Sequence, residues 1–244
     1  LNQRVDAKSP LIPRSEWEAC AVDKTLLAGE RVYLGLDLSA VIDLTALVAV
    51  SAEGGNRVAG WFWKPEDVLE EHERRDNAPY KLWANQGWLE AVPGRTINYG
   101  YVANRIAEIR MDYEIAAIAF DRWRIDTLVQ ACEGIGLDVW VEGKDAELPG
   151  GVRLVPFGQG FKDMAPAVDA LESSIVDRTF AHPRNPVLTF CFSNAIVTTD
   201  PAGNRKLDKS QTRFRIDGAV ATAMAMGLKG KNLGDDGPRE ISYE

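Results

Sequence analysis

The stretch Val32-Tyr-Leu-Gly-Leu-Asp37 decides the fold, because it is a short apolar run of strand-forming residues that ends on a carboxylate. The same pattern returns in Ile115-Ala-Ala-Ile-Ala-Phe-Asp121. A third carboxylate stands in Arg215-Ile-Asp217-Gly-Ala-Val220, where an Ala- and Met-rich helix begins. Two strand ends and one helix start can meet at the same edge of a sheet, so we expect the three carboxylates to converge there.

Converging carboxylates repel one another unless a cation lies between them. Hard divalent cations such as Mg²⁺ and Mn²⁺ prefer oxygen ligands, which Asp37, Asp121 and Asp217 supply. The pattern therefore predicts a metal-dependent active site. Each aspartate taken alone is also compatible with a simpler role, because strand-end aspartates form turns and Asp217 can cap the last helix.

Length and composition indicate an ordinary globular protein with one full core, since 45% of the 244 residues are hydrophobic. The apolar run at 115–120 is far shorter than the roughly 20 residues that cross a bilayer, and the polar N-terminus lacks a signal-peptide pattern, so we expect a cytoplasmic location. Cys20, Cys132 and Cys191 are odd in number and widely separated, which predicts reduced structural thiols.

A net charge of −8 weakens the case for nucleic-acid binding but does not exclude it, because a metal site needs acids and cations can gather locally. One basic cluster precedes the last helix and consists of Arg205, Lys206, Lys209, Arg213 and Arg215. Arg122 and Arg124 flank Trp123 directly after Asp121, where DNA backbone contacts are useful. The alternatives are a solvated basic loop and two surface arginines beside a core tryptophan.

Periodicity predicts three antiparallel strands at 32–37, 44–51 and 57–63, with Glu53-Gly-Gly-Asn56 as a turn. Further strands are expected at 115–121, 137–141 and 152–155, and a β-hairpin flap from 195–199 and 212–214. Helices are expected at 65–75, from 79 onward, and at 99–111, 124–133, 161–178, 185–194 and 217–229. Residues 1–30 are polar and aperiodic, which predicts a linker or arm. Residues 230–244 contain Gly234, Gly237 and Pro238, which predicts a flexible tail.

Three motifs stand in order along the chain: Gly35-Leu-Asp-Leu-Ser39 with Asp43-Leu-Thr45, Phe120-Asp-Arg-Trp123, and Leu207-Asp-Lys-Ser210 leading into Arg215-Ile-Asp-Gly218. Together with the order of strands, helices and acids, they resemble the ribonuclease H-like nucleases. More narrowly, residues 1–229 resemble the C-terminal nuclease domain of the large terminase subunit of tailed bacteriophages. The resemblance implies an α/β fold: a ribonuclease H-like mixed sheet, with three antiparallel strands followed by parallel strands, flanked by helices and carrying a β-hairpin flap.

The resemblance implies an endonuclease that cleaves double-stranded concatemeric viral DNA during genome packaging, with two divalent cations, Mg²⁺ or Mn²⁺. The family's three metal-binding acids map onto Asp37, Asp121 and Asp217, with Asp37 as our choice for the bridging ligand. Asp43 is either an outer ligand or a turn former. Lys209 either contacts the flap, a phosphate or the developing charge, or is solvated.

The chain has no Gly-x-x-x-x-Gly-Lys-Ser/Thr loop, so it lacks the nucleotide site of the terminase motor. The resemblance therefore implies that residues 1–30 connect to an ATPase domain and that residues 31–229 form the nuclease. It further implies a small terminase subunit and the portal as partners, in the cytoplasm of the infected bacterial host.

Three other interpretations compete with the packaging nuclease. Junction resolvases and transposase-like enzymes share the fold and the acidic site, but resolvases act as dimers on branched DNA. An actin-like sugar kinase or ATPase has a first phosphate loop similar to Gly35-Leu-Asp-Leu-Ser39, but it needs a second copy of the core fold. A catalytically inactive scaffold domain is disfavoured because acids stand at all three positions.

Overall fold

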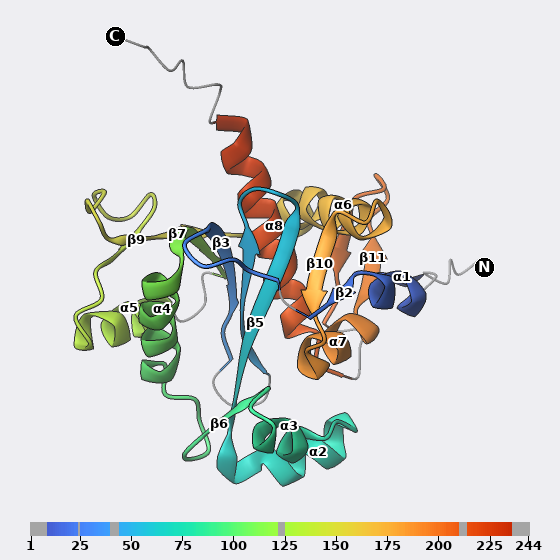
Figure 1. Ribbon diagram of the computed structural model, residues 1–244, viewed down its shortest axis with the longest axis horizontal. Helices are drawn as coiled ribbons and strands as arrows, with labels where there is room; N and C mark the ends of the chain where they lie inside the picture. Colours follow the sequence, from blue (N-terminus) through green and yellow to red (C-terminus); the bar gives the residue numbers. More distant parts are fainter. Residues whose placement is uncertain (1–8, 24, 40–43, 122–124, 210–213, 236–244) are drawn as a thin grey trace.

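The computed structural model describes residues 9–23, 25–39, 44–121, 125–209 and 214–235, and a mixed sheet runs through its centre (Figure 1). In this part of the chain the sheet has nine strands. Their order is β2 (Ala21–Val22), β10 (Phe180–Pro183), β5 (Asn56–Pro65), β4 (Thr45–Ser51), β3 (Arg31–Asp37), β7 (Glu114–Phe120), β9 (Val152–Pro156) and β8 (Val139–Val141), with β6 (Glu90–Val92) paired to β5.

The predicted mixed sheet is confirmed. Strands β3, β4 and β5 form an antiparallel meander, whereas β7 runs parallel to β3 and β9 and β8 continue in parallel. The order at this edge differs from the order along the chain, because β9 lies next to β7 and β8 lies outside it. Strands β2, β6 and β10 were not predicted, since each has at most four residues, too few to show a period.

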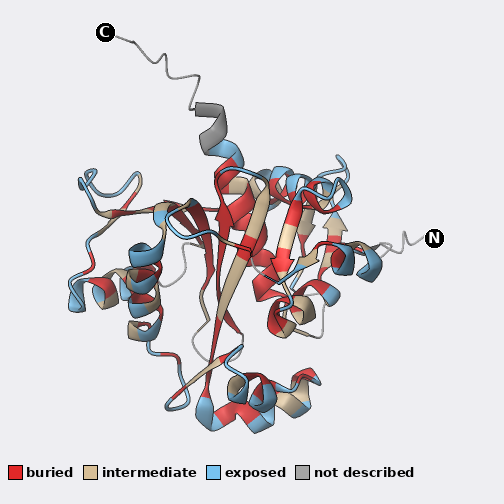
Figure 2. Cartoon of the chain, in the orientation of Figure 1, coloured by how far each residue is buried: buried red, intermediate tan, exposed pale blue. Residues whose placement is uncertain are grey.

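Helices cover both faces of the sheet (Figure 1). One face carries α4 (Gly100–Asp112) and α5 (Ile125–Gly134), and the other carries α6 (Phe161–Val176), α7 (Pro186–Ser193) and α8 (Asp217–Asp235). A 3₁₀ turn (Glu66–Val68), α2 (Leu69–Asp76) and α3 (Tyr80–Asn85) follow the end of β5. The inner strands and the sheet-facing side of α8 are buried, and the outer helix faces are exposed (Figure 2).

The described part of the linker or arm predicted at residues 1–30 is folded and packs against the rest of the chain. It contains β1 (Ser9–Pro10), α1 (Arg14–Ala19) and β2. The Trp17 side chain is 3% exposed and stacks between the rings of His182 and Phe192, with centroid distances of 3.7 and 3.9 Å. Burial of one indole outweighs the polar composition of its neighbours. Residues 1–8 lie outside the described part.

The helix predicted at 217–229 is longer than expected, because α8 continues to Asp235, past the predicted start of the tail at residue 230. Lys231 on this extension donates to Asp163 of α6 at 2.7 Å. Residues 236–244 lie outside the described part.

No described helix is both long and apolar enough to span a membrane. The three cysteines are buried and free, as predicted.

The hairpin exists, but its second strand differs from the prediction. Strand β11 (Ile196–Thr199) pairs with β12 (Arg205–Leu207), and β1 adds a third strand. The Asp200 carboxylate accepts the N–H groups of Ala202 and Asn204, which closes a tight turn and starts the return strand at once. Residues 212–213 of the predicted second strand are outside the described part, and Phe214 lies in no strand.

Helix α8 packs closely on β3, and this packing positions the first residue of α8 near the end of β3. Side chains of β3 alternate between the faces, so that Val32, Leu34 and Leu36 meet the α4 side and Tyr33 meets the α8 side. Gly35 therefore faces α8, and a Cβ atom there would lie 1.9 Å from the carbonyl oxygen of Ala221. The backbones approach more closely than any side chain allows.

We predict that Gly35→Ala lowers the free energy of unfolding by about 3 kcal/mol, because the clash is with backbone that no rotamer change can relieve. Gly134→Ala is the matched control, since no heavy atom lies within 4 Å of a Cβ built there. Urea denaturation measures both variants. Equal midpoints for the two would show that α8 does not sit this close to β3.

Candidate functional site

Strand register brings Asp37 and Asp121 together. The last paired residues of β3 and β7 are Leu36 and Phe120. Asp37 is the last residue of β3, and Asp121 directly follows β7. Asp37 lies two residues beyond Gly35, and Asp121 lies two residues beyond Ala119, which faces the α8 side. Because strand side chains alternate, both carboxylates belong to the α8 face at the carboxyl ends of parallel strands.

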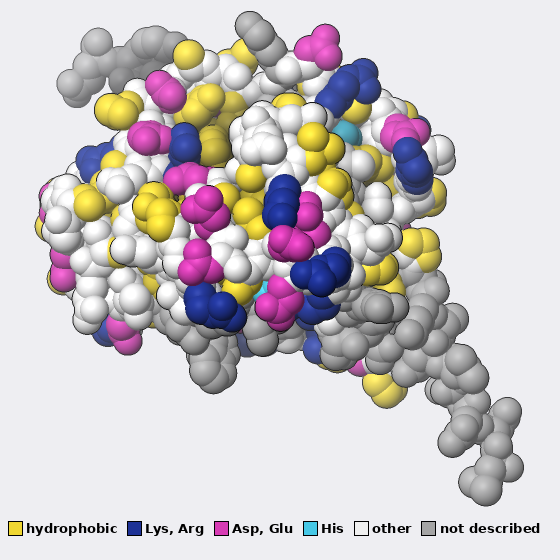
Figure 3. All heavy atoms as spheres, turned by 90° about the horizontal axis from the view of Figure 1, so that it is seen from below, with side chains coloured by type: hydrophobic (Ala, Val, Ile, Leu, Met, Phe, Trp, Pro, Cys, Tyr) yellow, Lys and Arg dark blue, Asp and Glu magenta, His cyan; other side chains and the backbone are white. Residues whose placement is uncertain are grey.

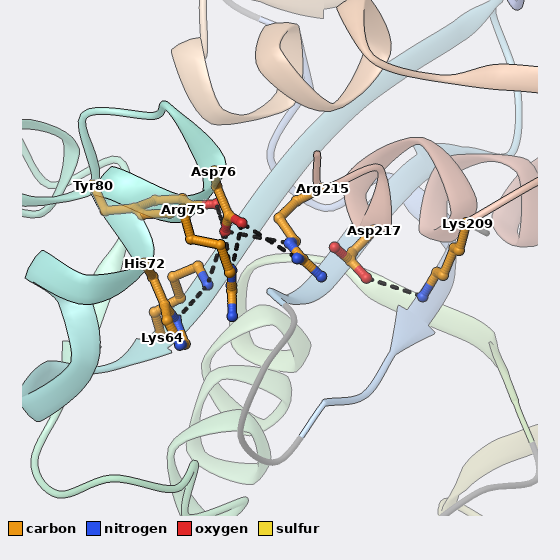
Figure 4. A network of polar contacts seen from close by, with 8 residues as sticks. All are labelled: Lys64, His72, Arg75, Asp76, Tyr80, Lys209, Arg215 and Asp217. Atoms are coloured by element: carbon orange, nitrogen blue, oxygen red, sulfur yellow. Dashed lines mark hydrogen bonds and ion pairs between the residues drawn. The ribbon is translucent and has the colours of Figure 1, made fainter. Parts of the chain in front are cut away.

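Asp217 reaches the same place as the first residue of α8. It is 2% exposed and Asp37 is 4% exposed. The Lys209 ammonium lies between them, donating to Asp37 Oδ2 at 2.5 Å and to Asp217 Oδ1 at 2.9 Å. Figure 4 shows the contact between Lys209 and Asp217 at the start of α8. Lys209 joins two acids that are remote in sequence, and its side chain remains 36% exposed.

The electrostatics show that these acids are crowded. Burial raises the pKa of Asp37 to about 6 against the opposing attraction of Lys209, and repulsion from Asp217 and Asp121 adds to the rise. Burial alone would lower the pKa of Lys209, but Asp217 and Asp37 raise it well above the ordinary lysine range. The two carboxylates therefore stabilise the charged form of the Lys209 ammonium.

The residues present fit a divalent cation. Asp217 Oδ2 is buried and has no hydrogen-bond partner among the described residues, so one carboxylate oxygen is already desolvated and can accept a cation. Lys209 supplies positive charge where two carboxylates need it, and its ammonium stands in for a cation. In the described part of the chain no three acidic, His or Cys side chains lie close enough together to hold an ion in this geometry.

The described residues of the basic segment at 205–215 do not form one free basic surface. Arg205 pairs with Asp169 and Glu172 of α6 at 2.5 Å each. Lys206 lies 5.0 Å from the centroid of the Phe161 ring. Lys209 points to the acids, and Arg215 points away from the hairpin to Asp76.

Four predicted site residues lie outside the described part of the chain: Asp43, Arg122, Arg124 and Arg213. Their positions therefore stay predictions. Figure 3 views the lower end of Figure 1, and its described Lys and Arg side chains are interspersed with Asp and Glu. The described part of this face is mixed in charge.

The sequence analysis missed a buried polar cluster beside the acids, centred on Asp76 (Figure 4). Two signals were available. Asp76 ends α2, where the helix dipole disfavours a carboxylate, and Lys64 follows the apolar run Trp61-Phe-Trp63. Both side chains are fully buried, and their ammonium and carboxylate groups lie 3.9 Å apart.

Comparison with known proteins shows the family of the chain. The family described as terminase large subunit, endonuclease domain, matches residues 1–231. The terminase large subunit of Enterobacteria phage HK97 is 45% identical over 239 residues, which cover 97% of this chain and 45% of that protein. The crystal structure of the HK97 large terminase matches with a TM-score of 0.82 at 46% identity, over 93% of this chain and 45% of that one.

The fold extends to remote relatives. The large terminase nuclease of the thermophilic phage G20c is 11% identical and matches with a TM-score of 0.52, over 86% of this chain and 95% of that one. This chain spans about half of the curated relatives it matches, 45% of the HK97 protein and 50% of protein YmfN of Escherichia coli K12, which is 25% identical. From the match over residues 1–231 and the acids gathered at the end of β3, the chain belongs to the family of terminase large-subunit endonuclease domains.

Proposed function

We propose that this chain is a metal-dependent endonuclease that cuts double-stranded concatemeric viral DNA during genome packaging. The observation that carries the proposal is the pair of buried carboxylates, Asp37 and Asp217, bridged by one ammonium with Asp121 beside them. Buried acids without a structural partner for every oxygen are costly to folding, which favours a functional reason for them.

Two divalent cations, Mg²⁺ or Mn²⁺, are proposed to be held by Asp37, Asp121 and Asp217, with Asp37 shared between them. Such cations supply activation of water and stabilisation of charge on the leaving oxygen. The G20c terminase nuclease, a remote relative by fold, has a structure with bound magnesium. Asp43 stays a proposed outer ligand.

The chain's own residues have distinct proposed roles. Asp37 and Asp217 are carried by strand β3 and the first turn of α8, so regular backbone positions their carboxylates, and a cation between them would displace the Lys209 ammonium. In the metal-free protein, Lys209 offsets the repulsion between the two carboxylates. As the most exposed of these three side chains, at 36%, it is also proposed to face the DNA phosphate.

DNA backbone contacts are proposed for the basic residues near the acids: Arg122, Arg124, Arg205, Lys206, Lys209 and Arg213. Arg215, which was predicted with them, is instead bonded to Asp76. The described members already have partners within the protein, so binding must compete with those contacts. We therefore expect modest affinity for isolated DNA, as the net charge of −8 also indicates.

The biological setting is proposed from the family. Its members' names place the nuclease in a terminase large subunit, so an ATPase domain, a small terminase subunit and the portal are the proposed partners, in the cytoplasm of an infected bacterium. Membership in this family favours linear packaging DNA over the branched substrate of a junction resolvase, and it disfavours the actin-like kinase.

We predict that Asp37→Asn, Asp121→Asn and Asp217→Asn each reduce plasmid cleavage by more than about a hundredfold, because each removes a charged oxygen ligand. EDTA should abolish cleavage by the unmodified protein, and Mn²⁺ should restore it at least as well as Mg²⁺. Glu114→Gln is the control, since this exposed carboxylate pairs with Arg31 at the start of β7, at the opposite end of the strand from Asp121. Cleavage that persists in EDTA would remove the mechanism from consideration.

We predict that Asp37→Asn raises the melting temperature of the metal-free protein by about 2–4 °C, because it removes one of the crowded buried charges and keeps an oxygen for Lys209. Saturating Mn²⁺ should reverse the order, since a ligand stabilises only the protein that binds it. Differential scanning calorimetry with EDTA or Mn²⁺ measures both. An Asn variant that melts lower in EDTA contradicts the account of crowding.

We predict that Lys206→Glu weakens DNA binding and lowers the slope of affinity against salt by about one phosphate contact. Lys206 is tested alone, because a glutamate at Lys209 would add a further acid to the site. Fluorescence anisotropy in EDTA at several salt concentrations measures binding without cleavage. Arg31→Glu, at the start of β3 and so at the opposite end of the strand from Asp37, is the control. An unchanged slope would place the DNA track elsewhere.

A further inference from the structure

The Asp76 carboxylate is the centre of a buried cluster that joins three segments of the chain (Figure 4). The neighbouring Arg75 donates to both of its oxygens, at 2.7 and 2.9 Å, and the Tyr80 hydroxyl donates at 2.9 Å. Arg215 adds a two-bond contact from across the structure, with Nε to Oδ2 and Nη2 to Oδ1 both at 3.2 Å. Asp76 itself is fully buried.

The α2–α3 side of this contact is held firmly. Lys64 at the end of β5 lies 3.1 Å from His72 Nδ1, and its ammonium sits over the Tyr80 ring at 4.5 Å. Burial, with Lys64 and Arg75 adding to it, lowers the pKa of His72 to about 4, so His72 is a neutral partner. Strand β5 therefore fixes the place of Asp76, and Asp76 is an anchor rather than a mobile surface acid.

The other side of the contact leads directly to the acidic site. Arg215 precedes Asp217 by two residues, and the residue between them, Ile216, is 1% exposed. The Ile216 carbonyl accepts the N–H groups of Ala219 and Val220, so the first turn of α8 starts there. Holding the Arg215 side chain therefore holds the turn that carries the Asp217 carboxylate.

The charges point in the same direction. The cations Lys64 and Arg215 both interact favourably with the Asp217 carboxylate. A planar guanidinium with two parallel bonds also restricts orientation in a way that a single ammonium contact does not.

We propose that Arg215 is a positioning residue for the nuclease, which through its two bonds to Asp76 holds the start of α8 so that the Asp217 carboxylate meets Asp37. The inference rests on the proposed function. Arg215 acts through Asp217, and its role is to set how tightly a divalent cation is held and how fast the bound DNA is cut.

The test compares Arg215→Gln with the unmodified protein in three measurements: Mn²⁺ binding by calorimetry, kcat and KM for DNA cleavage, and melting temperature. We expect Mn²⁺ affinity and kcat each to fall about tenfold, as is usual when a residue that orients a ligand is lost, with KM changed less than about twofold. Asp76→Asn should show the same pattern. The double variant should be no worse than either single change, because the two residues form one unit.

Arg57→Gln is the matched control. Arg57 also forms a half-buried pair with a carboxylate, Glu30, but it stands at the opposite end of β5 from the acids. It should lower the melting temperature without changing Mn²⁺ affinity. If Arg215→Gln behaves in the same way, Arg215 is only structural and the proposal is wrong. If KM and its salt dependence change while Mn²⁺ affinity does not, Arg215 is a DNA contact and the proposal is equally wrong.

Arg215→Lys keeps the charge and serves if the glutamine variant does not fold. It cannot make the two parallel bonds, so about a threefold loss of Mn²⁺ affinity is expected, and full retention would overturn the proposal. Absence of Mn²⁺ binding and cleavage in the unmodified protein would instead reject the proposed nuclease function. Normal binding and cleavage with an inert Arg215→Gln variant would reject only the positioning role.

Discussion

The close approach of α8 to β3 is the constraint on which the rest of the structure depends. It requires a glycine at position 35, because a Cβ atom there would lie 1.9 Å from the Ala221 carbonyl oxygen. The opposing residues of the sheet and helix are also small, as at Ala117 and Ala225. Only with the backbones in this contact does the first turn of α8 bring Asp217 within reach of the carboxylate that ends β3.

That packing creates an electrostatic problem. Two carboxylates are buried at one end of a sheet with a third beside them, and burial disfavours their charged forms. The chain offsets the cost with Lys209, drawn from the segment after the β11–β12 hairpin. The same arrangement that strains the metal-free protein suits a divalent cation, so stability and proposed activity make opposite demands on these side chains.

The buried carboxylate of Asp76 is stabilised in a different way, by hydrogen bonds to both of its oxygens. Asp76 is as buried as Asp37, but Arg75, Arg215 and Tyr80 occupy both of its oxygens. A buried acid with every oxygen bonded serves structure, whereas Asp217 keeps one oxygen without a described partner. The contrast between these acids separates the scaffold from the candidate site more clearly than burial or residue type does.

The sequence by itself determined the three-strand meander, the parallel β7 and the three aspartates, because these follow from alternation along single strands and from residues that end them. It did not determine that Trp17 packs against Phe192, that Lys209 lies between Asp37 and Asp217, or that Arg215 reaches Asp76. Those partners are separated by more than a hundred residues, except for Lys209 and Asp217. Local periodicity reports which face a residue occupies, but only the packed tertiary structure decides which charge or ring from a distant segment meets it there.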